Sequence, residues 1–205
     1  MKVILARHAD AKNQDGVFHG MNDEPLTKDG KVEALKMGQK FAKFNPSLVI
    51  TSTRRRSVDT GKAIARSLGI EQRAEKALDP LDLGEFVGKS TEEYTDDVKH
   101  FLENPDEQVP GGGTVREWAD KYIPFFNKIY NHKGKDESVI FVTHGRNILL
   151  SKADLDTGSN NNNYNPKMLT DSDTSTEHAG YAIADPAGKP NFSIETPRKV
   201  KPGQS

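Results

Sequence analysis

Three apolar segments of this sequence end in residues that can bind or attack a phosphoryl group. The segments are residues 2–6, 47–53 and 138–145, and each has the pattern of a strand buried on both faces. Their ends carry cationic or hydrogen-bonding residues. Arg7 and His8 follow the first segment, the second ends in Thr51 and Ser52 and runs into Arg54–Arg56, and the third ends in Thr143, His144 and Gly145. A guanidinium group binds phosphate through a planar fork of N–H donors, and an imidazole can attack phosphorus or donate a hydrogen bond. If the three ends meet, the sequence predicts a pocket for a dianionic phosphoryl group.

Each of these features alone also has an ordinary structural explanation. A histidine that follows a strand is more often a structural residue, and a run of arginines is more often the solvated start of a helix. Cations at a helix N-terminus are electrostatically unfavourable, however, because that end carries a positive partial charge. An anion bound among them removes the conflict. The coincidence of three such segments favours the phosphate-binding interpretation.

The elements that must position these residues are strands alternating with helices. Helical periodicity and capping signals predict helices over residues 25–44, 54–69, 91–105, 114–130 and 147–155. A weaker strand is predicted within 71–80, and a terminal hairpin over 180–185 and 191–196. This alternation predicts an α/β fold, a three-layer α/β/α sandwich with a mostly parallel sheet, and ligands bind beyond the carboxyl ends of the strands in such sheets.

Two of the helices carry more specific predictions. Thr27 is the expected N-cap of the first helix, and the spacing of Val32, Leu35, Gly38 and Phe41 predicts its buried face. In the helix over 114–130, Trp118, Tyr122 and the neighbouring aromatic residues recur at helical spacing. This spacing is typical of a core-facing helix rather than of a functional aromatic stripe.

Composition narrows the class of protein. The chain has 205 residues, no cysteine and a formal net charge of −1, with 29 Lys and Arg against 30 Asp and Glu. We expect one domain over residues 1–195 and a flexible tail over 196–205. The absence of cysteine excludes disulfides and thiolate–metal sites, and the balanced charge gives no reason to expect nucleic-acid binding. No apolar run approaches the ~20 residues that cross a bilayer, so a cytoplasmic protein without membrane contact is the expectation.

Four motifs, in the same order along the chain, resemble those of the histidine phosphatase superfamily, in its phosphoglycerate-mutase-like branch (branch 1). Residues 7–11 resemble the R-H-G-E-T signature, and residues 13–30 resemble the following N…G-x-F-Q-G…D-x-P-L-T-x-x-G loop. Residues 51–61 resemble S-S-P-x-x-R-A-x-x-T-A, which selects Arg56 among the three arginines, and residues 140–145 resemble V-x-V-S-H-G. The resemblance covers about residues 2–150 and implies a phosphoglycerate-mutase-like fold.

The resemblance also implies a mechanism that needs no metal and no cofactor. His8 would attack phosphorus and carry the phosphoryl group as a phosphohistidine. The groups implied to bind the phosphoryl oxygens are Arg7, Arg56, His144, Asn13 and the backbone N–H of Gly145. His19 stands where relatives often have a polar substrate contact, and His178 lies in a segment, 176–181, that resembles an element at the rim of the pocket.

The chain departs from the family pattern at the proton donor. Where the family often shows L-x-E-x-x-x-G, this chain has Leu78-Asp79-Pro80, and proline cannot transfer a proton. Asp82 is the first substitute for the catalytic acid, followed by Glu85 and Asp10. Ala9 and Ala11 also replace the glycine and the hydroxyl residue of the signature. Without an acid, substrates with good leaving groups, such as phosphohistidine or an acyl phosphate, are favoured.

The sequence therefore leaves three functions open. The first is a metal-independent phosphomonoesterase that releases inorganic phosphate from a small phosphorylated metabolite or a phosphoprotein. The second is a phosphoryl transfer of the phosphoglycerate mutase type, and the third is a non-catalytic phosphate-binding module, which Pro80 favours and the Arg7-His8 pair opposes. A nucleic-acid binder rests only on the arginine run and the basic tail. The physiological substrate and the oligomeric state have no signal in the sequence.

Overall fold

A five-stranded sheet forms the centre of the molecule. The computed structural model describes residues 1–12, 16–132, 137–158, 165–170 and 180–186. The strands are β1 (Lys2–Arg7), β2 (Pro46–Thr51), β3 (Glu71–Ala74), β4 (Ser138–Thr143) and β5 (Tyr181–Ala184). Their order is β3-β2-β4-β1-β5, and only β5 is antiparallel to its neighbour. The predicted mostly parallel sheet is confirmed.

In the part of the chain that the structure describes, five α-helices accompany the strands, close to the predicted ranges. They are α1 (Lys28–Phe41), α2 (Arg55–Leu68), α3 (Thr91–Glu103), α4 (Val115–Tyr130) and α5 (Gly145–Asp156). Thr27 caps α1 as predicted, because its hydroxyl accepts a hydrogen bond from the N–H of Gly30. Thr114 and Glu117 form a reciprocal capping box at the start of α4. These local signals fix where the helices begin.

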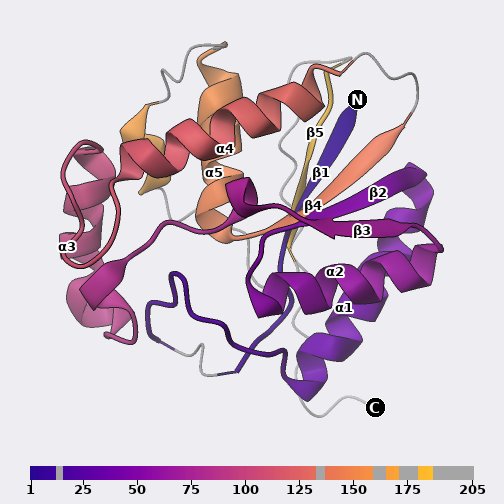
Figure 1. The fold of residues 1–205 in the computed structure, drawn as a ribbon, viewed down its shortest axis with the longest axis horizontal. Coiled ribbons are helices and arrows are strands. Elements are labelled where there is room, and N and C mark those ends of the chain that lie inside the picture. The colour runs from indigo at the N-terminus through magenta and orange to yellow at the C-terminus, as the bar shows by residue number, and fades with distance from the viewer. Residues whose placement is uncertain (13–15, 133–136, 159–164, 171–179, 187–205) are drawn as a thin grey trace.

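The sheet lies between two layers of helices (Figure 1). Successive side chains of β1 point to opposite faces: Val3 and Leu5 pack with α4 and α5, whereas Ile4 and Ala6 pack with α1 and α2. Both faces are covered, which explains why the central strands read as continuous apolar runs. The three-layer α/β/α prediction is confirmed.

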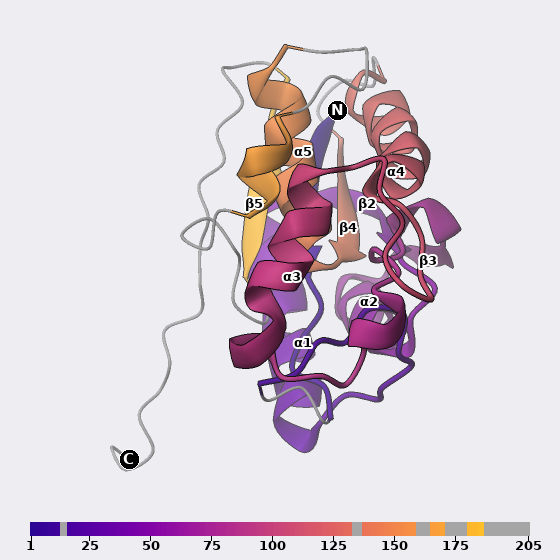
Figure 2. The same ribbon diagram turned by 90° about the vertical axis from the view of Figure 1, so that its left-hand side faces the viewer.

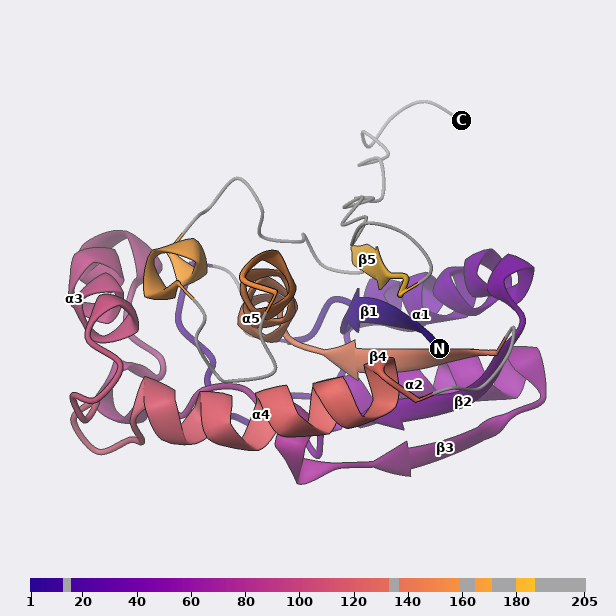
Figure 3. The same ribbon diagram turned by 90° about the horizontal axis from the view of Figure 1, so that it is seen from above.

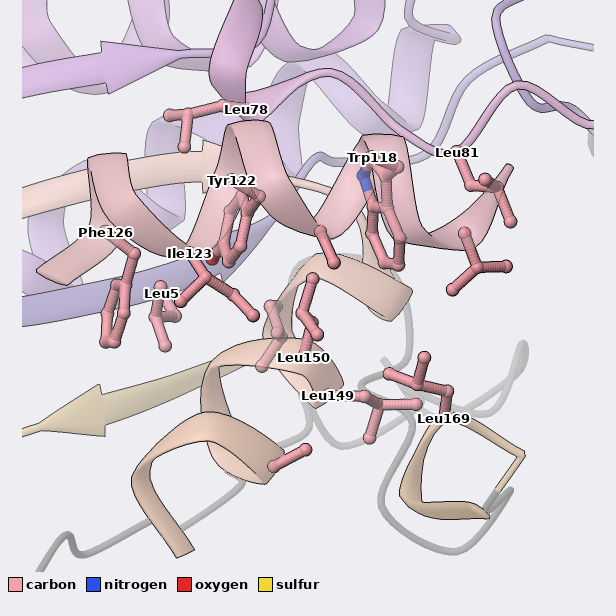
Figure 4. Close-up of a cluster of buried hydrophobic side chains, with 14 of the residues drawn as sticks. Leu5, Leu78, Leu81, Trp118, Tyr122, Ile123, Phe126, Leu149, Leu150 and Leu169 are labelled. Carbon is pink, nitrogen blue, oxygen red and sulfur yellow. The ribbon is translucent and has the colours of Figure 1, made fainter. Parts of the chain in front are cut away.

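The aromatic stripe of α4 belongs to the core, as predicted. Trp118 and Tyr122 lie on the side of α4 that faces the α5 side chains Leu149 and Leu150, and Phe126 lies beside Leu5 of β1 (Figure 4). These side chains are all buried. Packing of this stripe therefore fixes α5, whose first turn reaches the sheet edge where ligands are expected.

The predicted buried face of α1 is partly wrong. Its buried residues are Gly30, Ala34, Met37, Gly38 and Phe41, whereas Val32 and Leu35 are each 50% exposed. The reason is the close approach of α1 to α2 at Gly38, where a Cβ atom would lie 2.7 Å from the Cβ of Ser67. That approach turns the side of the helix that carries its glycines inward, and leaves Val32 and Leu35 half-exposed on the other side.

The parallel pairing brings the three chemistry-bearing strand ends together. Arg7 on β1 is in register with Thr143 on β4, and β2 flanks β4 on its other side. The N–H of His8 donates to the Thr143 carbonyl at 3.0 Å, and the N–H of Ser52 donates to the Val142 carbonyl at 3.0 Å. Figure 3 shows β1 to β4 pointing toward the side on which α3 lies, and Figure 2 looks onto α3 from that side.

Several predictions fall on residues outside the described part. These are the second hairpin strand at 191–196 and the tail at 196–205, so the single domain over 1–195 stays a prediction. Among the described helices, none combines the length and apolar character needed to cross a membrane.

Candidate active site

A cavity of about 550 Å³ opens at the carboxyl ends of β1, β2 and β4. Its polar lining includes Arg7, His8, Arg56, His144 and the backbone of Gly145. These residues come from three separate parts of the chain, and the rings of His8 and His144 lie with their centroids 5.3 Å apart. The structure therefore brings together the cations and imidazoles that the sequence predicted to meet.

His8 is held in an orientation suited to attack. Its ring is buried, with 3% of the residue exposed. Nδ1 lies 2.8 Å from the carbonyl oxygen of Ala9, which is a contact for an N–H donor, so the proton is assigned to Nδ1. Nε2 then keeps its lone pair and accepts a hydrogen bond from Nε of Arg56 at 3.2 Å. This tautomer can act as a nucleophile through Nε2.

Arg56 is the arginine of the 54–56 run that enters the site. It is 2% exposed, whereas the Arg55 side chain is 59% exposed and lies 3.6 Å from Asp59. The guanidinium of Arg56 donates to the carbonyl oxygens of Gly20 and Asn22 at 2.8 and 2.5 Å. The loop before α1 thus holds Arg56 between the two imidazoles.

His144 lies on the other side of Arg56. Its Nδ1 accepts from the Arg56 guanidinium at 3.2 Å, and its Nε2 lies 2.9 Å from the hydroxyl of Ser52. Ser52 directly follows β2 and Arg56 lies in the first turn of α2, so the segment after β2 fixes the ring of His144. When a phosphoryl group binds, an imidazole in this position can donate a hydrogen bond to it.

Arg7 and Gly145 complete the inner end of the cavity. A Cβ atom added to Gly145 would lie 3.9 Å from a terminal nitrogen of Arg7, which places the start of α5 beside this guanidinium. Gly145 is also the first residue of α5, whose first N–H groups have no partner within the helix. The cavity can therefore offer both guanidinium and backbone donors to an anion.

The electrostatics of the inner cavity favour a bound anion. Burial, followed by the charges of His144, Arg56 and Arg7, lowers the pKa of His8 well below its usual value. Burial and the arginine charges lower the pKa of His144 in the same direction. Burial also lowers the pKa of Arg56, to about 10. Both imidazoles are thus neutral at neutral pH, and a dianion would remove the repulsion among the cations.

These shifts predict that acidification destabilises the protein. The unfolded chain protonates its histidines below pH ~6.5, whereas His8 and His144 in the folded state stay neutral to lower pH. Their contribution to stability is therefore complete above pH ~6.5 and declines as the pH falls from there toward their folded-state pKa values. Thermal denaturation between pH 8 and pH 5 should show a falling midpoint. The double variant His8→Gln/His144→Gln should have a shallower dependence, and an equal slope would contradict this origin.

The predicted proton donor Asp82 does not reach the cavity. Pro80 lines the cavity, whereas Asp82 is exposed and its carboxylate accepts from the N–H of Gly84 at 3.1 Å. Gly84 has a positive φ of 46°, and a Cβ there would lie 2.1 Å from the carbonyl oxygen of Pro110. This close approach between distant loops fixes the path of the chain and leaves the Asp82 carboxylate on the outside.

The two other candidate acids also lie outside the cavity. Glu85 is exposed, and the Asp10 carboxylate accepts from the hydroxyl of Thr27 at 2.5 Å. No aspartate or glutamate among the described residues lines the cavity. The described lining thus offers cations and hydroxyl groups to a substrate, but no carboxylic acid.

The predicted substrate contacts divide into two groups. His19 and Gly145 line the cavity, as predicted. Asn13 and His178 lie outside the described residues. The predicted roles of all four residues in substrate binding therefore stay predictions.

One wall of the cavity was not predicted from the sequence. This wall includes Arg146 in the first turn of α5, and Thr91, Thr95 and Lys99 on α3. Arg146 could have been predicted from the sequence, because it is a cation in the first turn of a helix. Such a position is electrostatically unfavourable, for the same reason as the positions of Arg54–Arg56. The α3 residues belong to a polar helix without a motif, and only its docking places them at the cavity.

Comparisons with known proteins agree with this geometry. The family model described as histidine phosphatase superfamily (branch 1) matches residues 3–178. A 2,3-bisphosphoglycerate-dependent phosphoglycerate mutase of Parvibaculum lavamentivorans is 28% identical over 166 residues, 75% of this chain and 79% of that protein. Two solved structures share the fold at low identity.

The first is the phosphoserine phosphatase of Entamoeba histolytica in complex with 3-phosphoglyceric acid. It has a TM-score of 0.76 and 20% identity, with coverage of 96% of this chain and 98% of that chain. The second is a mycobacterial glucosyl-3-phosphoglycerate phosphatase in complex with VO3, with a TM-score of 0.75 and 18% identity over 95% and 97% of the two chains. The family match covers most of the chain and includes the three strand ends that form the cavity. The chain belongs to the histidine phosphatase superfamily, branch 1.

Proposed function

We propose that this protein is a metal-independent phosphatase that works through a phosphohistidine on His8 and releases inorganic phosphate. The observation that supports this most strongly is the position of His8 Nε2, unprotonated and 3.2 Å from the Arg56 guanidinium inside the cationic cavity. A nucleophile and a phosphate-binding cation are thus adjacent before any substrate arrives.

The proposed reaction has two displacements at phosphorus. Nε2 of His8 attacks in line, the phosphorus–oxygen bond to the leaving group breaks, and the phosphoryl group passes to His8. Water then attacks the phosphohistidine, the phosphorus–nitrogen bond breaks and inorganic phosphate leaves. Arg7, Arg56 and His144 stabilise the charge on the three equatorial oxygens in both steps.

The cavity lining supports a preference for good leaving groups. A positioned acid accelerates departure of a poor leaving group by about 10²–10⁴-fold, and the described lining contains no carboxyl group. Pro80 occupies the place that the family pattern gives to a glutamate. Aryl phosphates, acyl phosphates and phosphohistidine are therefore proposed as better substrates than phosphate esters of simple alcohols.

A series of aryl phosphates with increasingly basic phenols should show this preference. We expect kcat/KM to fall steeply as the leaving phenol becomes more basic, because no side chain protonates it. Asp82→Asn and Glu85→Gln should change kcat/KM by less than about two-fold across the series, whereas loss of a true acid would cost about 10²–10⁴-fold on the most basic phenols. A selective loss of that size in either variant would show that the substituted carboxylate is the proton donor.

The mutase alternative receives less support. A mutase returns the phosphoryl group to a second hydroxyl of its substrate, and both half-reactions then move protons on poorly acidic alcohols. The described lining lacks the carboxylate that would do so. Product analysis with a phosphoglycerate would separate the two, since a mutase interconverts the isomers faster than it releases phosphate.

A further inference from the structure

The cavity also holds a cationic residue, Arg146, that the proposed phosphoryl chemistry does not use. Arg146 follows Gly145 in the first turn of α5 and lines the cavity. Its guanidinium carbon lies 6.0 Å from the centre of the Phe18 ring. Its Nε atom is buried and has no hydrogen-bond partner among the described residues. An arginine placed in this way has donors to offer to a ligand.

The position of Arg146 is electrostatically unfavourable without a ligand. Burial lowers its pKa to about 10, and the N-terminus of α5 adds a positive partial charge. No aspartate or glutamate in the described lining of the cavity compensates it. Arg146 is half-buried, and a partly desolvated cation without an anionic partner costs free energy, which an anion supplied by a ligand would recover.

Helix α3 contributes further groups to the cavity lining that suit an anion. Lys99 on α3 lines the cavity. Its ion pair with Asp96, at 3.7 Å, does not hold it in place, because 98% of the Asp96 side chain is exposed to solvent. Thr91 and Thr95 on the same helix also line the cavity. The cavity lining also includes the apolar side chains of Leu81, Leu102 and Leu149.

We propose that Arg146, assisted by Lys99, forms a second anion subsite, so that the preferred substrate carries a second anionic oxygen group, a carboxylate or another phosphate, beyond the phosphoryl group that is transferred. This inference rests on the proposed phosphatase function. The planar fork of a guanidinium binds either group through paired hydrogen bonds. The apolar lining then contacts the body of the substrate between its two charged ends.

The test compares substrates that differ only in the second group. Phenyl phosphate and 3-carbamoylphenyl phosphate are the neutral references, and 3-carboxyphenyl phosphate and benzene-1,3-diyl bisphosphate are the anionic arms. We expect the wild-type protein to favour at least one anionic arm over the references by about 10- to 100-fold in kcat/KM, the range that follows from a hydrogen bond to a charged group. The arm with the larger preference identifies carboxylate or phosphate as the second group.

Variants then assign the preference to Arg146. Arg146→Met should reduce the ratio of anionic to neutral substrates to about one, and Arg146→Lys should retain part of it. A ratio within one variant cancels any general loss of activity. Lys62→Met, which removes an exposed cation from α2, is the matched control and should keep the wild-type ratio. Arg146→Glu should reverse the preference, favouring 3-(aminomethyl)phenyl phosphate over 3-carboxyphenyl phosphate.

Two results would overturn the inference. One is equal turnover of neutral and anionic substrates by the wild-type protein. The other is an Arg146→Met variant in which all substrates decline together, because Arg146 would then serve the transferred phosphoryl group. Failure of the proposed function itself looks different, since none of the substrates would release phosphate. In that case, calorimetric binding of 3-carboxyphenyl phosphate and phenyl phosphate to the wild-type protein and to Arg146→Met still measures the subsite: loss of a wild-type preference in the variant supports it, and equal affinities contradict it.

Discussion

Replacing His8 with alanine should reduce phosphate release by at least about 10⁴-fold, because loss of a catalytic nucleophile removes the covalent route and has effects of that order. His8 is the only described residue that combines a buried imidazole, an Nδ1 contact to a carbonyl oxygen at 2.8 Å and an Nε2 atom facing Arg56. The measurement is steady-state phosphate release from an aryl phosphate at saturating substrate concentration.

The His8 variant also separates an enzyme from a phosphate binder. His132 is exposed and lies outside the cavity, so His132→Ala is a matched control that should retain wild-type turnover. The His8→Ala protein should still bind inorganic phosphate, because Arg7, Arg56 and His144 remain. If the wild-type protein and His8→Ala bind phosphate equally and neither releases it from any substrate, the protein is a binding module.

Replacing Arg56 with methionine should give the second-largest effect, a loss of about 10²–10³-fold in kcat, the range measured when one preorganised donor to a developing negative charge is removed. Arg56 contacts both imidazoles and also donates hydrogen bonds to the phosphoryl oxygens in the proposed mechanism. Arg56→Lys should recover only part of the loss, because an ammonium group cannot contact His8, His144 and the substrate with a planar fork.

The Arg56 variant needs a stability measurement beside the kinetics. Removal of the Arg56 guanidinium leaves the carbonyl oxygens of Gly20 and Asn22 without this hydrogen-bond donor. An unsatisfied buried acceptor costs about 1–3 kcal/mol of folding free energy. The thermal midpoint should therefore fall, and turnover must be compared well below it. Arg55→Met is the control, because Arg55 is exposed. Equal kinetic losses in the two variants would mean that Arg56 has no special position.

The central arrangement of the site could be predicted because it follows from sheet geometry. Three buried runs that end in Arg7-His8, Ser52 and His144 meet at one edge as soon as their strands are parallel neighbours. Sequence spacing alone could not say which of the three arginines enters the site. The resemblance to the family selected Arg56, and the structure places Arg56 between the imidazoles and Arg55 in solvent.

The parts of the site that sequence reasoning missed depend on contacts between distant segments. The position of Asp82 follows from Gly84 packing against the backbone near Pro110, a contact that no local pattern reveals. Lys99 reaches the cavity only because α3 docks across the strand ends, and α3 carries no motif. The exposed Val32 and Leu35 have the same origin, since the α1–α2 approach at Gly38 decides which face of α1 is buried.

The most direct test of the central claim is an acid- and base-quench experiment with a substrate labelled on the phosphoryl group. In the wild-type protein, mixing on the millisecond scale should give protein-bound label that survives base and is lost in acid, and peptide mapping should place it on the peptide that contains His8. The His8→Ala protein should acquire none. Substantial turnover by His8→Ala, or stable label on a different residue, would show that the imidazole beside Arg7 does not carry the phosphoryl group.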